Sequence, residues 1–185
     1  MASSSDVFIL SASSAAEPAE AVLQAIKESG VNPARIQDFI FGADRPALIS
    51  AEALARETAI HCPQVTVSSS LRALFFAAQS ILRQDADLVL VGGAQDGECA
   101  ALLLASPAAV GLYNLMPLAR IEAFSLTGAD AALKQAERTL EDIEISLDGS
   151  CGALLTVELV ADLQEQVASW GMVSVAGAAM LIERI

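Results

Sequence analysis

The sequence predicts an α/β fold built from two similar halves. Short apolar runs typical of strands alternate with segments of helical periodicity, as in a sheet covered by helices. A small-residue elbow, an apolar helix, a strand and a closing strand occur twice in this order, starting at Ser69-Ser70 and at Ser150-Cys151. This duplication predicts a pseudo-twofold axis. We place the halves at residues 1–106 and 107–185 of one compact domain.

Composition narrows the possible partners. The chain has 185 residues, of which 54% are hydrophobic and only 4% aromatic, so its core must consist of Ala, Val, Leu and Ile. Chains of this length bury roughly 70% of their unfolded surface, which gives an ample core. The high hydrophobic content excludes intrinsic disorder, because disorder requires low hydrophobicity. With 10 basic and 23 acidic residues the net charge is -13. We therefore expect neither nucleic acid nor an anionic membrane as a partner.

The sequence also predicts where the protein is located and whether it binds a metal ion. Cys99–Ala119 carries no charge, but Pro107 and Gly111 interrupt it, so we expect no membrane span. Met1–Val7 lacks the positive segment of a signal peptide. The three cysteines are widely spaced and odd in number, which fits neither a disulfide framework nor a zinc motif, and the acidic residues are scattered. We expect a cytoplasmic protein without metal or cofactor.

The first half contains five expected strands and three expected helices. Pro18 near its start and Gly30 just past its end delimit the first helix, and Ser50 is a suitable N-cap for the second. The strands are expected at Asp6–Ala12, Gln37–Phe41, Gln64–Val67, Asp87–Val91 and Ala100–Ala105, and the helices at 17–29, 50–60 and 71–84.

The helix Leu71–Gln84 is apolar nearly all round. Such a helix is buried on both sides rather than laid on a surface. We therefore expect Phe75 in the core, where replacement by alanine costs ~3–5 kcal/mol.

The second half repeats the alternation with fewer residues. Strands are expected at Pro117–Ser125, Asp142–Leu147 and Met172–Val175, followed by a closing strand at the end of the chain. Helices are expected at Ala131–Leu140 and from the end of the Gly149–Gly152 segment to about Ala168.

Several segments resemble the thiolase superfamily, which includes thiolases and ketoacyl synthases. DVFILSAS at 6–13 is similar to the opening strand of that family, and the stretch 66–95 (TVSSSLRALFFAAQSILRQDADLVLVGGAQ) to its nucleophile elbow, central helix and Gly-Gly strand. ALLLAS at 101–106 and PLARIEAFSLTGAD at 117–130 resemble the end of the first half and the start of the second. The resemblance implies a layered αβαβα domain, with two buried helices between two five-stranded sheets.

The chain departs from the family at the positions that carry chemistry. Alignment of the elbow places Val67 where the family has its nucleophilic cysteine. DIEISL passes directly into DGSCGALL, without the Asn-Glu-Ala-Phe and Gly-His-Pro segments. Val175-Ala176-Gly177 replaces the Cys-x-Gly-Gly loop. Only Asp96, Gly97 and Glu98 stand where thiolases insert the loop domain that holds coenzyme A.

Other nucleophiles have a structural interpretation beside a catalytic one. Ser68 and its neighbours Ser69 and Ser70 are candidate nucleophiles, but they also suit an N-cap cluster. Cys151 lies at the expected start of a helix, where the dipole lowers a thiol pKa, although buried cysteines are also common core residues. The single histidine, His61, is expected at the far end of its strand from the elbow.

These observations favour a non-catalytic, thiolase-like pseudoenzyme that acts as a structural or regulatory dimer subunit. The resemblance implies pairing through Gln64, Val65, Thr66 and Val67, either as a homodimer or with a thiolase- or synthase-like partner. An unguarded edge strand of this kind fits such pairing. The alternatives are a module that binds an acyl chain or acyl thioester, and an acyltransferase that uses Cys151.

Overall fold

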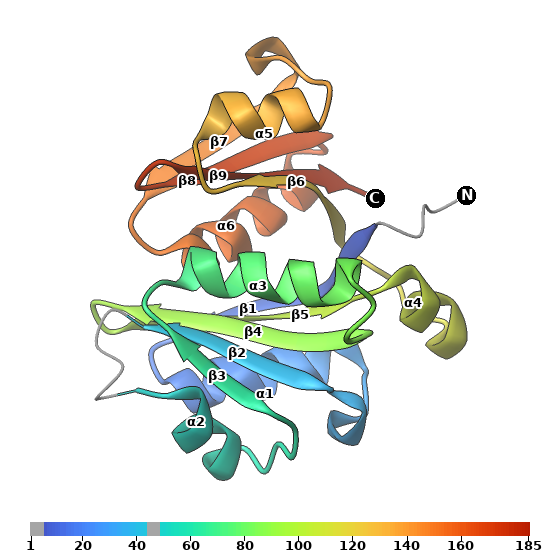
Figure 1. Cartoon of the computed structure of the whole chain (residues 1–185), viewed down its shortest axis with the longest axis vertical. Coiled ribbons are helices and arrows are strands. Elements are labelled where there is room, and N and C mark those ends of the chain that lie inside the picture. The colour runs from blue at the N-terminus through green and yellow to red at the C-terminus, as the bar shows by residue number, and fades with distance from the viewer. Residues whose placement is uncertain (1–5, 44–48) are drawn as a thin grey trace.

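The computed structural model describes residues 6–43 and 49–185, so most of the segment Met1–Val7 lies outside the described residues. Within them, five layers are stacked (Figure 1). Helices α3 and α6 lie between two layers of strands, α1 and α2 cover the outer side of one strand layer, and α5 covers the other. The α/β class and the layered αβαβα arrangement are confirmed.

The first strand layer has the order β3-β2-β4-β5-β1, in which β2 is parallel to β3 and β4 while β5 is antiparallel to β4 and β1. All five expected strands are present. The elements are β1 (Val7–Ala15), α1 (Pro18–Ser29), β2 (Asp38–Ala43), α2 (Ala51–Glu57), β3 (Gln64–Val67), α3 (Ser70–Leu82), β4 (Leu88–Gln95) and β5 (Glu98–Ala105), with a short 3-10 helix at Pro33–Arg35.

The second strand layer has the four strands expected from the sequence and one fewer than the family resemblance implied. Its order is β6-β9-β8-β7, so among the described residues it has four strands and not five. Matching the orders pairs β6 with β1, β9 with β5, β8 with β4 and β7 with β2, and no described element corresponds to α2 and β3. The elements are α4 (Pro107–Tyr113), β6 (Ala119–Ser125), α5 (Ala129–Gln135), β7 (Ile145–Gly149), α6 (Gly152–Glu165), β8 (Trp170–Val175) and β9 (Ala178–Arg184), with a 3-10 helix at Leu140–Asp142.

Several helices end earlier than the sequence predicts. Ala59, Gln84, Glu137 and Val167 each have a positive φ, close to +60°, two residues beyond the helix that precedes them. A backbone in the left-handed region cannot continue a right-handed helix. This explains why the helices expected at 50–60, 71–84, 131–140 and up to 168 stop at Glu57, Leu82, Gln135 and Glu165.

Helix α3 is buried along most of its surface but not all of it. Leu71, Ala73, Leu74, Ala77, Ala78 and Ile81 are in the core. Phe76, in contrast, is 46% exposed, and Phe75 is only half-buried, with its ring 5.1 Å from that of Phe124 on β6. The expectation that Phe75 is a fully buried core residue is therefore wrong, because one edge of α3 faces out between the strand layers.

The two strand layers meet along a short antiparallel ladder. Among the described residues, it joins Val7–Ile9 of β1 to Ala119–Ile121 of β6. Arg120 reinforces this junction, because its guanidinium lies 3.5 Å from Asp6, 3.0 Å from Glu122 and 2.5 Å from Glu183. These carboxylates raise the pKa of Arg120, although burial opposes them. The boundary that we place between residues 106 and 107 stays a prediction.

The helices of the described residues are too short or too polar to traverse a bilayer.

Candidate functional site

The elbow between β3 and α3 packs unusually close to the strands beside it. A Cβ atom on Gly93 would lie 2.2 Å from the Cβ of Ser70, and one on Gly42 would lie 2.3 Å from the backbone of Ser69 and Ser70. Non-bonded carbon atoms do not approach this closely, so glycine alone fits at both positions without a shift of the helix. Gly42 and Gly93 are opposite each other on β2 and β4, which makes a shallow seat for the start of α3.

Two helix N-termini meet at this elbow. Ser70 is the first residue of α3, and Cys151 is the N-cap of α6, yet their side chains are 3.4 Å apart and both are buried. The backbone N–H of Ala153 donates to the hydroxyl of Ser70 at 3.1 Å. Ser70 thus caps α6 from another helix, while Cys151 makes no capping hydrogen bond. The hydroxyl at the elbow is engaged in holding the two halves together.

Replacing Ser70 by alanine is expected to lower the free energy of unfolding by about 1 kcal/mol, the usual loss for an N-cap. Urea denaturation followed by circular dichroism measures this difference. Ser68→Ala is the matched control, because Ser68 is exposed and an exposed change costs about 0.5 kcal/mol or less. Equal stability of the Ser70→Ala variant and the unchanged chain would contradict the capping role.

The other candidate residues are not gathered at one point. Val67 is the last residue of β3. Its side chain is half-buried against the central core, which is the apolar cluster formed by α3, α6 and the strand residues that face them. Ser69 is the N-cap of α3, since its hydroxyl accepts from the N–H of Arg72 at 3.3 Å. His61 is exposed and precedes β3, so the whole strand separates it from the elbow. Among the described side chains the elbow thus combines a thiol and hydroxyls without the imidazole.

Two further thiols are held in their neutral form. Burial raises the pKa of Cys62 and of Cys99 to about 11. Since the thiolate is the nucleophile, only about one in a thousand of such groups is reactive at pH 8. We expect iodoacetamide at pH 8 to label both at least ~10-fold more slowly in the native protein than in urea, as measured by mass spectrometry. Equal rates in the two states would contradict the burial of these thiols.

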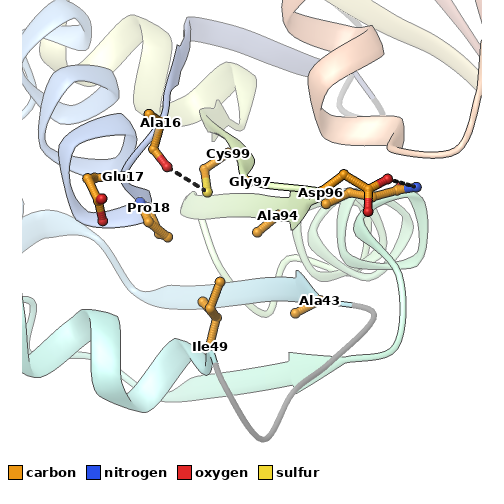
Figure 2. Close-up of a pocket in the computed structure, with 10 residues that line it drawn as sticks. Ala16, Glu17, Pro18, Ala43, Ile49, Ala94, Asp96, Gly97 and Cys99 are labelled. Carbon is orange, nitrogen blue, oxygen red and sulfur yellow. Dashed lines mark hydrogen bonds between the residues drawn. The ribbon is translucent and has the colours of Figure 1, made fainter.

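A cleft of about 480 Å³ lies on the other side of the first strand layer (Figure 2). Ala43 and Ala94 line it, and they follow Gly42 and Gly93. Because successive residues of a strand point to opposite faces, the cleft and the elbow are on opposite sides of the sheet. Cys99 is also at the cleft, where its thiol approaches the carbonyl oxygen of Ala16 at 3.8 Å. Glu17 and Asp96 give this cleft a negative charge.

Strand β3 forms an edge of the sheet, because β2 is its only neighbour among the described strands. Val65 is 50% exposed there. The hydroxyl of Thr66 accepts from the N–H of Ala51 at 2.9 Å and so holds the start of α2. In the described part of the chain, no group of three His, Cys, Asp or Glu side chains is placed to hold a metal ion.

The fold thus combines two strand layers of matching strand order with two central helices that meet at their N-termini. Comparison with known proteins shows which class of fold this is. The sequence matches no protein-family model and no curated protein. The fold resembles human mitochondrial 3-ketoacyl-CoA thiolase in complex with CoA, with a TM-score of 0.84, 14% identity, and 97% of this chain and 98% of the other covered.

Two further solved structures agree with this likeness. Bacillus anthracis acetyl-CoA acetyltransferase has a TM-score of 0.86 and 14% identity over 97% of this chain and 99% of its own. An Ascaris suum thiolase in complex with coenzyme A has a TM-score of 0.84 and 14% identity over 97% of this chain and 100% of its own. The chain therefore has the thiolase fold.

Proposed function

We propose that this chain is a non-catalytic, thiolase-like pseudoenzyme that serves as a structural or regulatory subunit of a dimer. The observation that carries this proposal is that the side chains at the elbow pack the two halves together. The Ser70 hydroxyl accepts from the N–H of Ala153 and lies against the thiol of Cys151, so the groups nearest to a nucleophile position are engaged in packing.

The chemistry of acyl transfer supports the proposal. A Claisen or thiolytic step needs a thiolate, a base to activate it, and donors for the oxyanion. Val67 provides no nucleophile, and the only histidine of the chain precedes the strand that leads to the elbow. Cys151 is buried, with a hydroxyl rather than a base beside it.

The test of this part is an assay of acetoacetyl thioester cleavage and of thioester hydrolysis by the purified chain. We expect no turnover above the rate of buffer, and no difference between the unchanged chain and Cys151→Ala. Turnover that disappears in Cys151→Ala would overturn the proposal and favour the acyltransferase.

The dimer part of the proposal rests on β3. Phe39 N–H of β2 donates to the carbonyl of Pro63, so the ladder alternation directs the N–H groups of Gln64 and Thr66 away from β2, toward the open edge. A second β3 can pair there about a twofold axis, which closes the assembly. Either a second copy of this chain or a thiolase-like partner presents such an edge. The three free cysteines fit a cytoplasmic setting for this dimer, because thiols stay reduced there.

Sedimentation of the purified chain tests the pairing. We expect a dimer at micromolar concentration, and we expect Gln64→Pro to shift it toward the monomer because proline removes an outward N–H. Gln64 is preferable to Thr66 as a target, since the Thr66 hydroxyl also holds α2. A monomeric chain of 19.1 kDa that also fails to bind a thiolase-like partner would contradict the dimer.

The cleft beside Cys99 supports a second candidate, the binding of an acyl chain. Its volume of about 480 Å³ and its lining of Ala, Pro and Ile side chains suit an apolar ligand. Glu17 and Asp96 disfavour the phosphates of coenzyme A at the same place. Calorimetry with a medium-chain acyl thioester lacking phosphates tests this, and Ala94→Leu, which fills the cleft, should abolish any heat of binding.

A further inference from the structure

The second half of the molecule leaves one strand edge open. β7 pairs with β8 on one side and with no described strand on the other. Its counterpart in the first half, β2, has β4 on one side and β3 on the other. In the second half β7 leads into α6 after Ser150 and Cys151 alone, so the place that β3 fills in the first half has no occupant from the described residues.

We propose that β7 binds an extended, lysine- or arginine-bearing segment of another protein, which adds to the sheet as a further strand. Edge addition of this kind supplies backbone hydrogen bonds that any extended peptide can make. The inference rests neither on the loss of catalysis nor on pairing through β3.

The two faces of β7 indicate that the bound segment is a strand alone, without a helix that would cover the outer face of the sheet. Ile145 and Leu147 are half-buried and pack against the central core from its edge. On the opposite face Ser146 and Asp148 are exposed, whereas the matching face of β2 buries aromatic side chains beneath α1 and α2. The outer face of β7 is therefore already suited to water. The backbone groups along the outer edge of β7 have no partner among the described strands. Beside them, Ile145 and Leu147 stay half-buried.

The charge around β7 selects the partner. Asp148 lies on the strand, and Glu141, Asp142 and Glu144 precede it, all exposed. Glu144 accepts from the N–H groups of Ser169 and Trp170, and Arg138 is engaged over the ring of Trp170 at 4.3 Å. No lysine or proline lies within Ile145–Gly149 to guard the edge. A second copy would bring the same carboxylates opposite these, so a basic segment is the favoured occupant.

The test uses the full chain and two fluorescein-labelled nonapeptides of alternating valine and threonine, one flanked by lysines and the other by glutamates. Fluorescence anisotropy should show binding of the lysine peptide that is at least threefold tighter than that of the glutamate peptide at low salt. Asp148→Lys should weaken the lysine peptide at least threefold. Glu20→Lys, the same charge change on the exposed face of α1, should not.

Hydrogen exchange locates the bound peptide. Amides of residues 145–149 should gain protection with the lysine peptide present, and those of β3 should not. Protection in β3 alone, no binding, or equal binding to the unchanged chain and Asp148→Lys would each overturn the proposal. So would a dimer of the free chain that Asp148→Lys dissociates and Gln64→Pro leaves intact, because β7 would then bind a second copy.

Discussion

A Gly93→Ala variant is expected to lose about 3 kcal/mol or more of its free energy of unfolding, at the upper end of the losses caused by overpacking. The added methyl group would lie 2.2 Å from the Cβ of Ser70, a rigid atom at the first turn of α3. Relief requires α3 to move away from β4, which would also pull Ser70 from the N–H of Ala153. Thermal and urea denaturation measure the loss.

Gly111→Ala is the matched control for this variant. Gly111 lies in α4 with no atom within 4 Å of its would-be Cβ, so alanine should be neutral or stabilise by up to ~1 kcal/mol. Adding Ser70→Gly to Gly93→Ala removes the clashing Cβ and should restore part of the stability. A Gly93→Ala chain as stable as the Gly111→Ala chain would show that the elbow is not closely seated.

Leu74→Ala should destabilise the chain by ~2–5 kcal/mol, the cost of a cavity in a packed core. Leu74 is 0% exposed and lies on the face of α3 that contacts the central core. It replaces Phe75 as the most informative position on this helix, because the Phe75 ring is only half-buried. Urea denaturation gives the value, provided that the slope of the transition is unchanged.

Leu112→Ala provides the same substitution on the surface. Leu112 is 75% exposed on α4, so its truncation should change the stability by about 0.5 kcal/mol or less. Similar losses for Leu74→Ala and Leu112→Ala would mean that α3 does not pack between the strand layers.

The order of the elements was predictable from the sequence because periodic and continuous apolar runs both report which residues are buried. DLVLVGG and ALLLAS are continuous apolar runs, and they form the neighbouring strands β4 and β5. Gly30 signalled the end of α1, and its φ of 68° fits that role. The other helix ends were not predictable, since Ala59, Gln84, Glu137 and Val167 adopt the same left-handed backbone without being glycine.

The contacts at the elbow were beyond the reach of sequence patterns. Ser69 as a cap for its own helix follows from local spacing. Ser70 as a cap for α6 joins residues 83 positions apart, which only the tertiary fold brings together. The missing strand had a visible signal, because DIEISL runs directly into DGSCGALL and only four strands were expected in the second half. The resemblance to the thiolase superfamily, in contrast, implied five strands in each sheet.

The position of β1 has a consequence for how the molecule folds. β1 is central in the ladder order, but its partners are distant in the chain: Phe8 pairs with Ala105 and with Arg120. Contacts of such high sequence separation slow the folding of a domain, because a long loop must close before any of them forms. During synthesis at ~5–20 residues per second, β1 waits roughly 5–20 s for β5 to emerge. Throughout that interval β1, which begins with the apolar run Val7–Leu10, has no strand beside it, which makes it the segment of this chain that a chaperone has most reason to bind.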